Sequence, residues 1–328
     1  MDHVVEDDGD DIYIYRGGRA PLNVTITHAR IDKSVDEIEG NAFRNCVQLE
    51  QVDTHDGISK IGANAFYRCT SLRRINLKSA VEIGEGAFYI CESLESTEFG
   101  DYLLETIGYN AFNGCRSLTH LKLPSIIDIG ISAFSNCKRL IDVELSERLE
   151  SIEGSAFYGC ERLQRIAIPL KRDIFALHQV FQRYNQFDYC DQLTTVDLVG
   201  GIDKTVASLH MKSWRAEMIA EINRINQVLP NTPANEKTEE IRQWLDLISD
   251  KMDHYEVEHR RYVKEGVTLL ELALWKAKLC EKEDYAVEGR KTKKAKVDAD
   301  AESYRRDKRI TCGADMVIKN VLPFLQLE

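Results

Sequence analysis

A nine-residue pattern recurs six times along the chain at nearly constant spacing, and this repeat constrains the fold more than any other feature. Each copy begins with Ile, places Ala-Phe at its centre and ends with Cys, and a Leu follows three residues later. The phenylalanines are separated by steps of 23, 22, 24, 22 and 23 residues, at Phe43, Phe66, Phe88, Phe112, Phe134 and Phe157. A unit of this length cannot bury its apolar face alone, so neighbouring units must stack and share one core.

A short alternating segment after each Cys-x-x-Leu step predicts a strand. In one such segment, Ile75 and Leu77 are expected to point inward, whereas Arg74 and Asn76 point outward. Strands from successive units are expected to add to one parallel sheet. A seventh, divergent unit around Phe187 follows a step of 30 residues, which predicts an insertion before it.

The consensus I-G-x-x-A-F-x-x-C-x-x-L-x-x-I-x-[IL]-P resembles the BspA-type leucine-rich repeat family over about Ile38 to Leu198. The resemblance implies an α/β repeat fold, a solenoid with a parallel sheet followed here by a helical C-terminal region. We expect an acidic tail and N-terminal cap over 1–37, a solenoid of about seven units over 38–200 and a helical region over 201–328. Two units depart from the consensus: the first ends Val52-Asp53-Thr54 without the closing apolar residue, and the third has Thr97 where Ile is usual.

The two ends of the chain have patterns of their own. At the N-terminal end, Ile12–Tyr15 and Val24–Ile26 alternate, which predicts either a hairpin or an irregular first coil. From Met211 to Leu229, apolar spacing predicts a helix. A second helix starts near Ile241, where apolar residues recur at steps of 4, 3, 4, 3, 4 and 3, a coiled-coil-like seam. We expect the two helices to pair as a hairpin within the chain, with association between copies as the alternative.

The last part of the chain is charge-dense and then apolar. Residues 281–310 carry 10 Lys/Arg and 8 Asp/Glu, which predicts a solvated linker, and Met316–Leu327 is expected to dock back as a short helix. The segments 225–230, 259–279 and 311–325 resemble the C-terminal region of a functionally uncharacterised family of leucine-rich-repeat proteins from diatoms. That resemblance implies an algal origin but no activity.

The sequence carries no motif of a catalytic or metal site. It has no GxxxxGK[ST], HExxH or GxSxG motif, and its nine cysteines form no CxxC pair. The repeat cysteines are therefore predicted to be small buried hydrophobes. We expect no enzyme activity, no cofactor and no metal.

Charge and hydropathy bear on partners and compartment. The net charge of −11 makes nucleic-acid binding unlikely, and no apolar run reaches the ~18 residues of a membrane span. The N-terminal sequence MDHVVEDDGDD does not resemble a secretory signal, which predicts an intracellular and cytoplasmic protein. The basic run Arg290–Lys296 leaves a nuclear protein as an alternative.

The outward strand positions vary in size and charge while the inward positions repeat. This contrast is typical of a repeat protein that binds a partner through its sheet face, so we predict a non-enzymatic protein-interaction scaffold. The column that lies four residues after each Leu carries four acids and one lysine, which slightly favours a basic or polar partner. An enzyme or regulator with a site at the junction near 171–189 is the alternative. The predicted partner-binding residues are Arg74, Asn76, Glu98, His120, Lys122, Asp142, Glu144 and Arg165.

Overall fold

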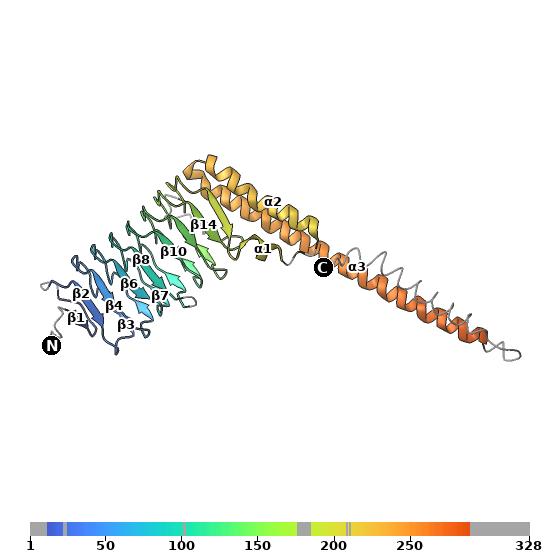
Figure 1. Cartoon of the computed structure of the whole chain (residues 1–328), viewed down its shortest axis with the longest axis horizontal. Helices are drawn as coiled ribbons and strands as arrows, with labels where there is room; N and C mark the ends of the chain where they lie inside the picture. Colours follow the sequence, from blue (N-terminus) through green and yellow to red (C-terminus); the bar gives the residue numbers. More distant parts are fainter. Residues whose placement is uncertain are drawn as a thin grey trace. The chain divides into compact units, whose positions relative to one another are not determined.

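The computed structural model describes residues 12–21, 25–100, 103–175, 185–207, 209 and 211–288. Their repeats form a parallel β-solenoid, and helices follow it in the sequence (Figure 1). The predicted fold class, a repeat solenoid followed by a helical C-terminal region, is therefore confirmed. The chain divides into two compact units, residues 1–205 with 220–249 and residues 206–219 with 250–328.

The strands that follow the Cys-x-x-Leu steps, together with two equivalent strands before the first such step, form two parallel sheets rather than one. Five of them pair in the order β1-β2-β4-β6-β8, and four pair in the order β10-β12-β14-β15. Their bounds are β1 Ile12–Tyr15, β2 His28–Ile31, β4 Gln51–Asp53, β6 Arg74–Leu77, β8 Ser96–Phe99, β10 His120–Lys122, β12 Asp142–Glu144, β14 Arg165–Ile168 and β15 Thr195–Leu198. The expectation of one continuous sheet is wrong, because β8 and β10 are not hydrogen-bonded neighbours.

The break follows the unit in which Thr97 replaces the usual Ile. Thr97 of β8 occupies the inward position next to Ile75, and its Oγ1 is buried without a hydrogen-bond partner among the described residues. The Phe88-to-Phe112 step across this unit is also the longest regular step, at 24 residues. A polar inward residue and a longer turn both weaken the match between this strand and the next one.

A third parallel sheet, with six strands, runs along the solenoid, and the sequence pattern did not predict it. Its six strands have two residues each and pair in the order β13-β11-β9-β7-β5-β3. Each strand ends on the buried Ile that opens the repeat. The bounds are β3 Glu37–Ile38, β5 Lys60–Ile61, β7 Glu82–Ile83, β9 Thr106–Ile107, β11 Asp128–Ile129 and β13 Ser151–Ile152.

Glycine follows the Ile in the central coils because the backbones of successive coils touch there. A Cβ atom on Gly108 would lie 2.8 Å from the backbone nitrogen of Glu85, which is closer than real Cβ contacts. The repeat therefore keeps this position free of a side chain in Gly62, Gly84, Gly108 and Gly130.

The core is a set of stacked columns, one residue from each coil. The repeat phenylalanines, from Phe43 to Phe187, are fully buried, and neighbouring rings stack with centroids 4.9 to 5.8 Å apart. This separation is close to the ~4.8 Å spacing of paired strands. The predicted sharing of one core by neighbouring coils is thus confirmed.

The repeat cysteines do more than fill space. Each buried thiol donates a hydrogen bond to the backbone carbonyl of the phenylalanine in the preceding coil, for example Cys115 Sγ to Phe88 O at 3.2 Å. Burial raises the pKa of these thiols above the usual value, so they stay protonated and can donate. The same contact recurs at Cys69, Cys91, Cys137, Cys160 and Cys190.

The N-terminal segment forms the first coil of the solenoid. Strand β1 pairs in parallel with β2, with Ile12 opposite His28 and Tyr15 opposite Ile31. The hairpin alternative is therefore wrong, because a hairpin would pair the two strands antiparallel. The strand predicted at Val24–Ile26 lies instead at His28–Ile31, where Ala29 and Ile31 supply the inward residues.

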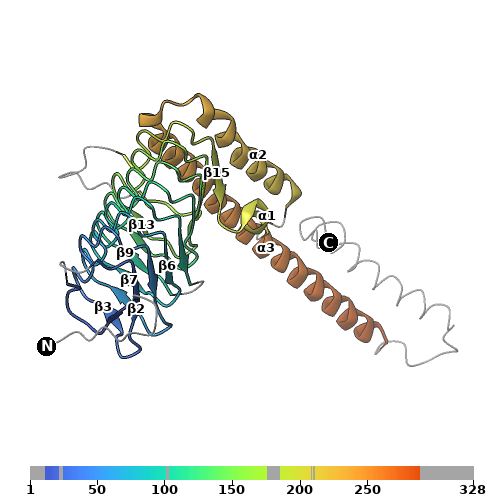
Figure 2. The ribbon, with the colours of Figure 1, turned by 60° about the vertical axis from the view of Figure 1, so that its left-hand side comes forward.

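The helical region comprises α1 Gly201–Val206, α2 Lys212–Val228 and α3 Lys237–Glu288, with short 3-10 turns at Leu229–Asn231 and Ala234–Glu236. Figures 1 and 2 both show α2 alongside α3. Buried Trp244 donates from Nε1 to the carbonyl of Glu221, and Tyr255 donates to Glu217 at 2.7 Å. These contacts run in opposite directions along the two helices, so α2 and α3 pair antiparallel within the chain.

The start of α3 closes the last coil of the solenoid. Lys237 is only 2% exposed, and its Nζ donates to the carbonyls of Cys190, Asp191 and Leu193 at 3.2, 2.9 and 2.6 Å. Asn226 of α2 accepts a hydrogen bond from the backbone nitrogen of Val196 in β15, at 2.8 Å. Backbone groups that would otherwise be unpaired at the end of the stack are satisfied by these side chains.

Several predictions concern residues outside the described ones. They include the acidic start of the chain up to Asp11, most of the 281–310 linker, the basic run Arg290–Lys296 and the apolar segment Met316–Leu327. Among the helices that the structure describes, none combines the length and apolar character that a bilayer crossing requires.

Candidate interaction surface

The outward positions of the five-stranded and four-stranded sheets form the candidate surface, because the backbone alternation turns these side chains away from the core. In β6, Arg74 is exposed and Asn76 half-buried, whereas Ile75 and Leu77 are buried, as predicted. The eight predicted residues divide between the sheets. Arg74, Asn76 and Glu98 lie on the five-stranded sheet, and His120, Lys122, Asp142, Glu144 and Arg165 lie on the four-stranded sheet.

Two of the predicted binding residues are paired with each other. Arg165 Nη1 lies 2.8 Å from Asp142 Oδ1, and Arg165 Nε lies 2.6 Å from Asp197 Oδ2. The hydrogen bonds that Arg165 donates, first to Asp142 and then to Asp197, outweigh desolvation and raise the pKa of Arg165. The guanidinium bridges two acids on neighbouring strands, so this part of the surface is already neutralised.

Three other predicted residues are exposed and form no such pair. Arg74, His120 and Lys122 have exposed side chains, and none of them makes an ion pair or side-chain hydrogen bond with another described residue. Glu144, beside Lys122 in the register, is half-buried. Asn76 Oδ1 accepts a hydrogen bond from the backbone of Lys78. The side chain of Glu98 lies outside the described part of the structure.

On the five-stranded sheet, Asp53 is the centre of a small polar cluster. It accepts hydrogen bonds from Gln51 at 2.8 Å and from His28 at 2.9 Å, and Arg30 Nε lies 3.7 Å away. Burial alone would raise the pKa of Asp53, but these hydrogen bonds and the nearby Arg30 charge outweigh it and lower the pKa. Two of the four acids that favoured a basic partner, Asp53 and Asp197, are therefore already paired within the chain.

The five-stranded sheet is hollowed at both ends of its strands. A depression of about 400 Å³ lies where the strands begin, and its lining includes His28, Arg73 and Arg74. A second depression of about 360 Å³ lies where they end, and its lining includes Arg16, Arg30, Asp32 and His55. Together they flank the outward side chains of β2 and β4.

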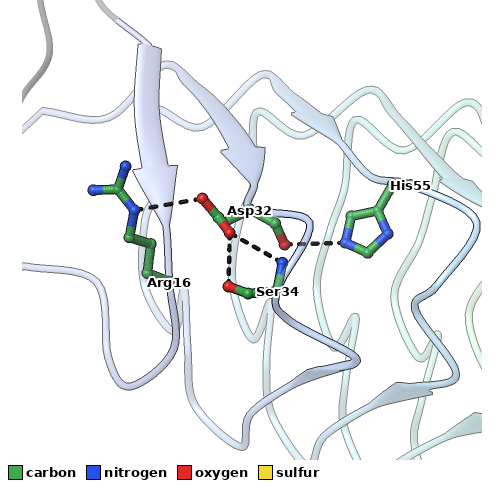
Figure 3. Close-up of polar contacts among 4 residues, drawn as sticks. All are labelled: Arg16, Asp32, Ser34 and His55. Atoms are coloured by element: carbon green, nitrogen blue, oxygen red, sulfur yellow. Dashed lines mark hydrogen bonds and ion pairs between the residues drawn. The ribbon is translucent and has the colours of Figure 1, made fainter.

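Asp32 organises the rim of the second depression, as Figure 3 shows. Its Oδ1 accepts from Ser34 Oγ at 2.6 Å and from Ser34 N at 3.0 Å, and its Oδ2 accepts from Arg16 Nε at 3.4 Å. The hydrogen bonds of Ser34, more than the charge of Arg16, lower the pKa of Asp32. His55 Nδ1 accepts from the backbone of Gly57, so Nε2 carries the proton and donates to the Asp32 carbonyl at 3.0 Å. The rim is thus fixed by the fold.

The sequence reasoning missed the outward residues of the first coils. His28 and Arg30 were not predicted as site residues because the second strand was expected four residues earlier. The spacing to Gln51 could have located them, since His28 pairs with Gln51 at a normal coil step of 23 residues. Ala167 lies four residues after Leu163, in the column expected to face outward, but it is buried.

The junction with the helical region carried the alternative expectation of an enzyme site. Residues 176–184 of this junction lie outside the described residues. In the described part, the Lys237 ammonium is engaged by three carbonyls, and desolvation by burial lowers its pKa. No group of three His, Cys, Asp or Glu side chains converges as metal ligands within the described ranges.

Comparison with known proteins places this architecture in a family. The BspA type leucine-rich repeat region matches in six copies over residues 22–127 and 105–220. A T. pallidum leucine-rich repeat protein is 28% identical, with 56% of this chain and 82% of that chain covered and a TM-score of 0.45. A leucine-rich repeat protein from Bacteroides ovatus is 20% identical, with 57% and 69% covered and a TM-score of 0.29.

The pneumococcal vaccine antigen PcpA is 17% identical, with 57% of this chain and 65% of that chain covered and a TM-score of 0.30. No curated protein matches the chain. The family match covers more than half of the sequence, and the stacked Phe and Cys columns have the spacing of its repeat. The chain therefore belongs to the BspA type leucine-rich repeat family.

Proposed function

We propose that this chain is a non-enzymatic protein-interaction scaffold whose partner binds the outward face of the solenoid strands. The observation that carries the proposal is the contrast between the two sides of each strand. Inward residues form repeated aliphatic and aromatic columns, whereas outward residues change at every coil and include exposed, unpaired cations. Packing explains the inward pattern but does not require the outward one.

The charges on this face favour an acidic segment of the partner protein. Asp53, Asp142 and Asp197 are engaged within the chain, while Arg74, His120 and Lys122 are not. Arg74 and Lys122 lie on β6 and β10, the strands before and after β8 along the solenoid, so an extended acidic segment could contact both. This preference replaces the one for a basic or polar partner, because two of the four acids counted for it, Asp53 and Asp197, are paired within the chain.

The test is affinity capture from the native cell, with the tagged full chain as bait. The double variant Arg74→Glu/Lys122→Glu reverses two exposed cations of the face. We expect recovery of a bound protein to fall about tenfold or more, because reversed charges repel an acidic partner. Raising the ionic strength should also reduce the amount of partner that the unchanged chain recovers.

The matched control is Arg139→Glu/Arg162→Glu, which makes the same change in net charge. Both arginines are exposed and lie in turns outside the strands, and the described residues give neither an ion pair. Capture should survive this change. Equal loss with both variants, or no loss with the face variant, would contradict the proposal.

The cellular location of the protein and the resemblance of its C-terminal region are also proposals. We place the protein inside the cell, with a nuclear location through Arg290–Lys296 as the alternative, and an imaging test of the tagged full chain decides between them. The resemblance of the C-terminal region to the diatom family also remains a prediction. It adds no activity to the scaffold role.

A further inference from the structure

The first strand of the solenoid is an open edge of the five-stranded sheet. Among the strands that the structure describes, β1 is hydrogen-bonded to β2 alone (Figure 1). The opposite end of the solenoid is closed by side chains of the helical region. There, Asn226 accepts from the backbone nitrogen of Val196 in β15, and Lys237 donates to three carbonyls of the last coil. The described residues supply no comparable cap to β1.

The alternation of the backbone fixes which groups of β1 face the open edge. The backbone nitrogen of Asp32 donates to the carbonyl of Tyr15 at 2.9 Å, so the backbone groups of Tyr15 and Tyr13 face β2. The N–H and C=O groups of Ile12 and Ile14 therefore face away from β2. Within the described ranges, these two residues have no backbone partner on that side. Such a row of unpaired groups is a template for pairing with another strand.

The side chains of β1 do not protect this edge. The strand reads Ile-Tyr-Ile-Tyr, with a regular register and without a charge or a proline, the devices that usually keep edge strands apart. Tyr15 is fully buried, and the ring of Tyr13 lies edge-on to Phe43 with centroids 6.2 Å apart, so both tyrosines face the core. Tyr13 is nevertheless only half-buried. The aromatic core thus ends on a partly exposed ring, while Ile12 and Ile14 face outward.

We propose that β1 pairs antiparallel with β1 of a second copy of this chain, so that the two five-stranded sheets join edge to edge. A symmetric dimer must match the strand with itself, and β1 allows this. With Tyr13 opposite Tyr13 of the second copy, Ile12 lies opposite Ile14 and Ile14 opposite Ile12. Each Ile12–Ile14 pair then exchanges both of its N–H···O=C bonds, because the backbone groups of these residues face the edge.

The side chains also fit this register. The two Tyr13 residues form the close, non-hydrogen-bonded pair of an antiparallel ladder, in which aromatic side chains contact each other across the strands. Each ring then covers the exposed part of the other, so the core continues from one copy into the next. This match between the strand and itself favours a second copy over an unrelated segment.

The twofold axis of such a dimer is perpendicular to the sheet, so the outward faces of both copies lie on the same side. A partner with two acidic segments would then bind both faces with an increased effective concentration. The dimer itself does not depend on the proposed scaffold role, and its test uses no partner protein.

The test is sedimentation velocity of the purified full chain at about 1 and about 50 µM, where a dimer is seen as a mass that rises with concentration. Ile14→Pro removes the N–H that faces the second copy and leaves the bonds to β2 in place. We expect it to raise the dissociation constant of the dimer at least about tenfold. Ile14→Thr is the matched control, because it also removes the isoleucine side chain but keeps the N–H and a β-branched residue. This variant should still form the dimer.

A pair of charge variants tests the register and separates a lost contact from a misfolded chain. Ile12→Lys/Ile14→Lys places like charges opposite each other and should give monomers, and Ile12→Glu/Ile14→Glu should do the same. An equimolar mixture of these two variants should restore the dimer, because opposite charges then meet across the strands. A monomeric unchanged chain at both concentrations, a dimer that survives Ile14→Pro, or a mixture that stays monomeric overturns the proposal.

Discussion

Replacement of Lys237 by Met tests how the helical region closes the solenoid. The variant keeps most of the side-chain volume but removes the ammonium that donates to Cys190, Asp191 and Leu193. A buried carbonyl that loses its donor destabilises the fold by about 1–3 kcal/mol. Burial of the charged ammonium is itself unfavourable, as the lowered pKa of Lys237 indicates, and the substitution removes this cost. We therefore take the lower value, about 1 kcal/mol, for each of the three carbonyls.

The free energy of unfolding should therefore fall by about 3 kcal/mol. For a unit of this size, that change corresponds to a decrease in melting temperature of roughly 6–12 °C. Differential scanning calorimetry of the full chain measures it, and hydrogen exchange at 190–198 shows whether the loss is local to the last coil. The control is Lys264→Met on the exposed side of α3, which should change stability by less than about 0.5 kcal/mol. If Lys237→Met behaves like this control, the three contacts do not hold the end of the solenoid.

The other predictions concern the core and the sheet face. Phe112→Ala should destabilise the solenoid by about 3–5 kcal/mol in denaturant unfolding, because it leaves a cavity between two stacked rings. Thr97→Val should stabilise it by about 1 kcal/mol, since a buried hydroxyl without a partner is removed, and a loss of stability would refute that explanation. Asp53 has a lowered pKa in the folded state, so its ionised form stabilises the fold above the ordinary pKa of 3.8, and this contribution is lost as the pH falls through the folded-state pKa. In the variant Asp53→Asn, the free energy of unfolding should therefore change less with pH across that acidic range. The thiol of Cys115 should resist alkylation at neutral pH until the protein unfolds, as mass spectrometry would show, because it is buried and protonated.

The repeat spacing was sufficient to predict the stacked core, because each Phe, Cys and Leu recurs at a step that only a solenoid coil accommodates. It did not predict the six-stranded sheet, since two-residue strands are too short to show an alternating pattern. The break between β8 and β10 was also missed. It depends on how the unit around Thr97 pairs with its neighbour, which a consensus does not reveal.

The candidate site was predicted only in outline. Alternation placed Arg74, His120 and Lys122 outward correctly, since a strand fixes which side chains face away from the core. Pairing across strands cannot be read from one unit at a time, so the ion pair between Asp142 and Arg165 was not predicted. Lys237 was missed because a lysine at a helix start gives no sign of its carbonyl partners.

The most direct test of the proposed role is carbodiimide cross-linking of the captured complex, which joins lysine amines to carboxylates in contact. Lys122 is an exposed lysine on the four-stranded sheet, and Lys60 lies on the six-stranded sheet. We predict cross-links from Lys122 to acidic residues of the partner and none from Lys60. Cross-links to the partner from Lys60, with Lys122 unlinked, would contradict binding at the outward strand face.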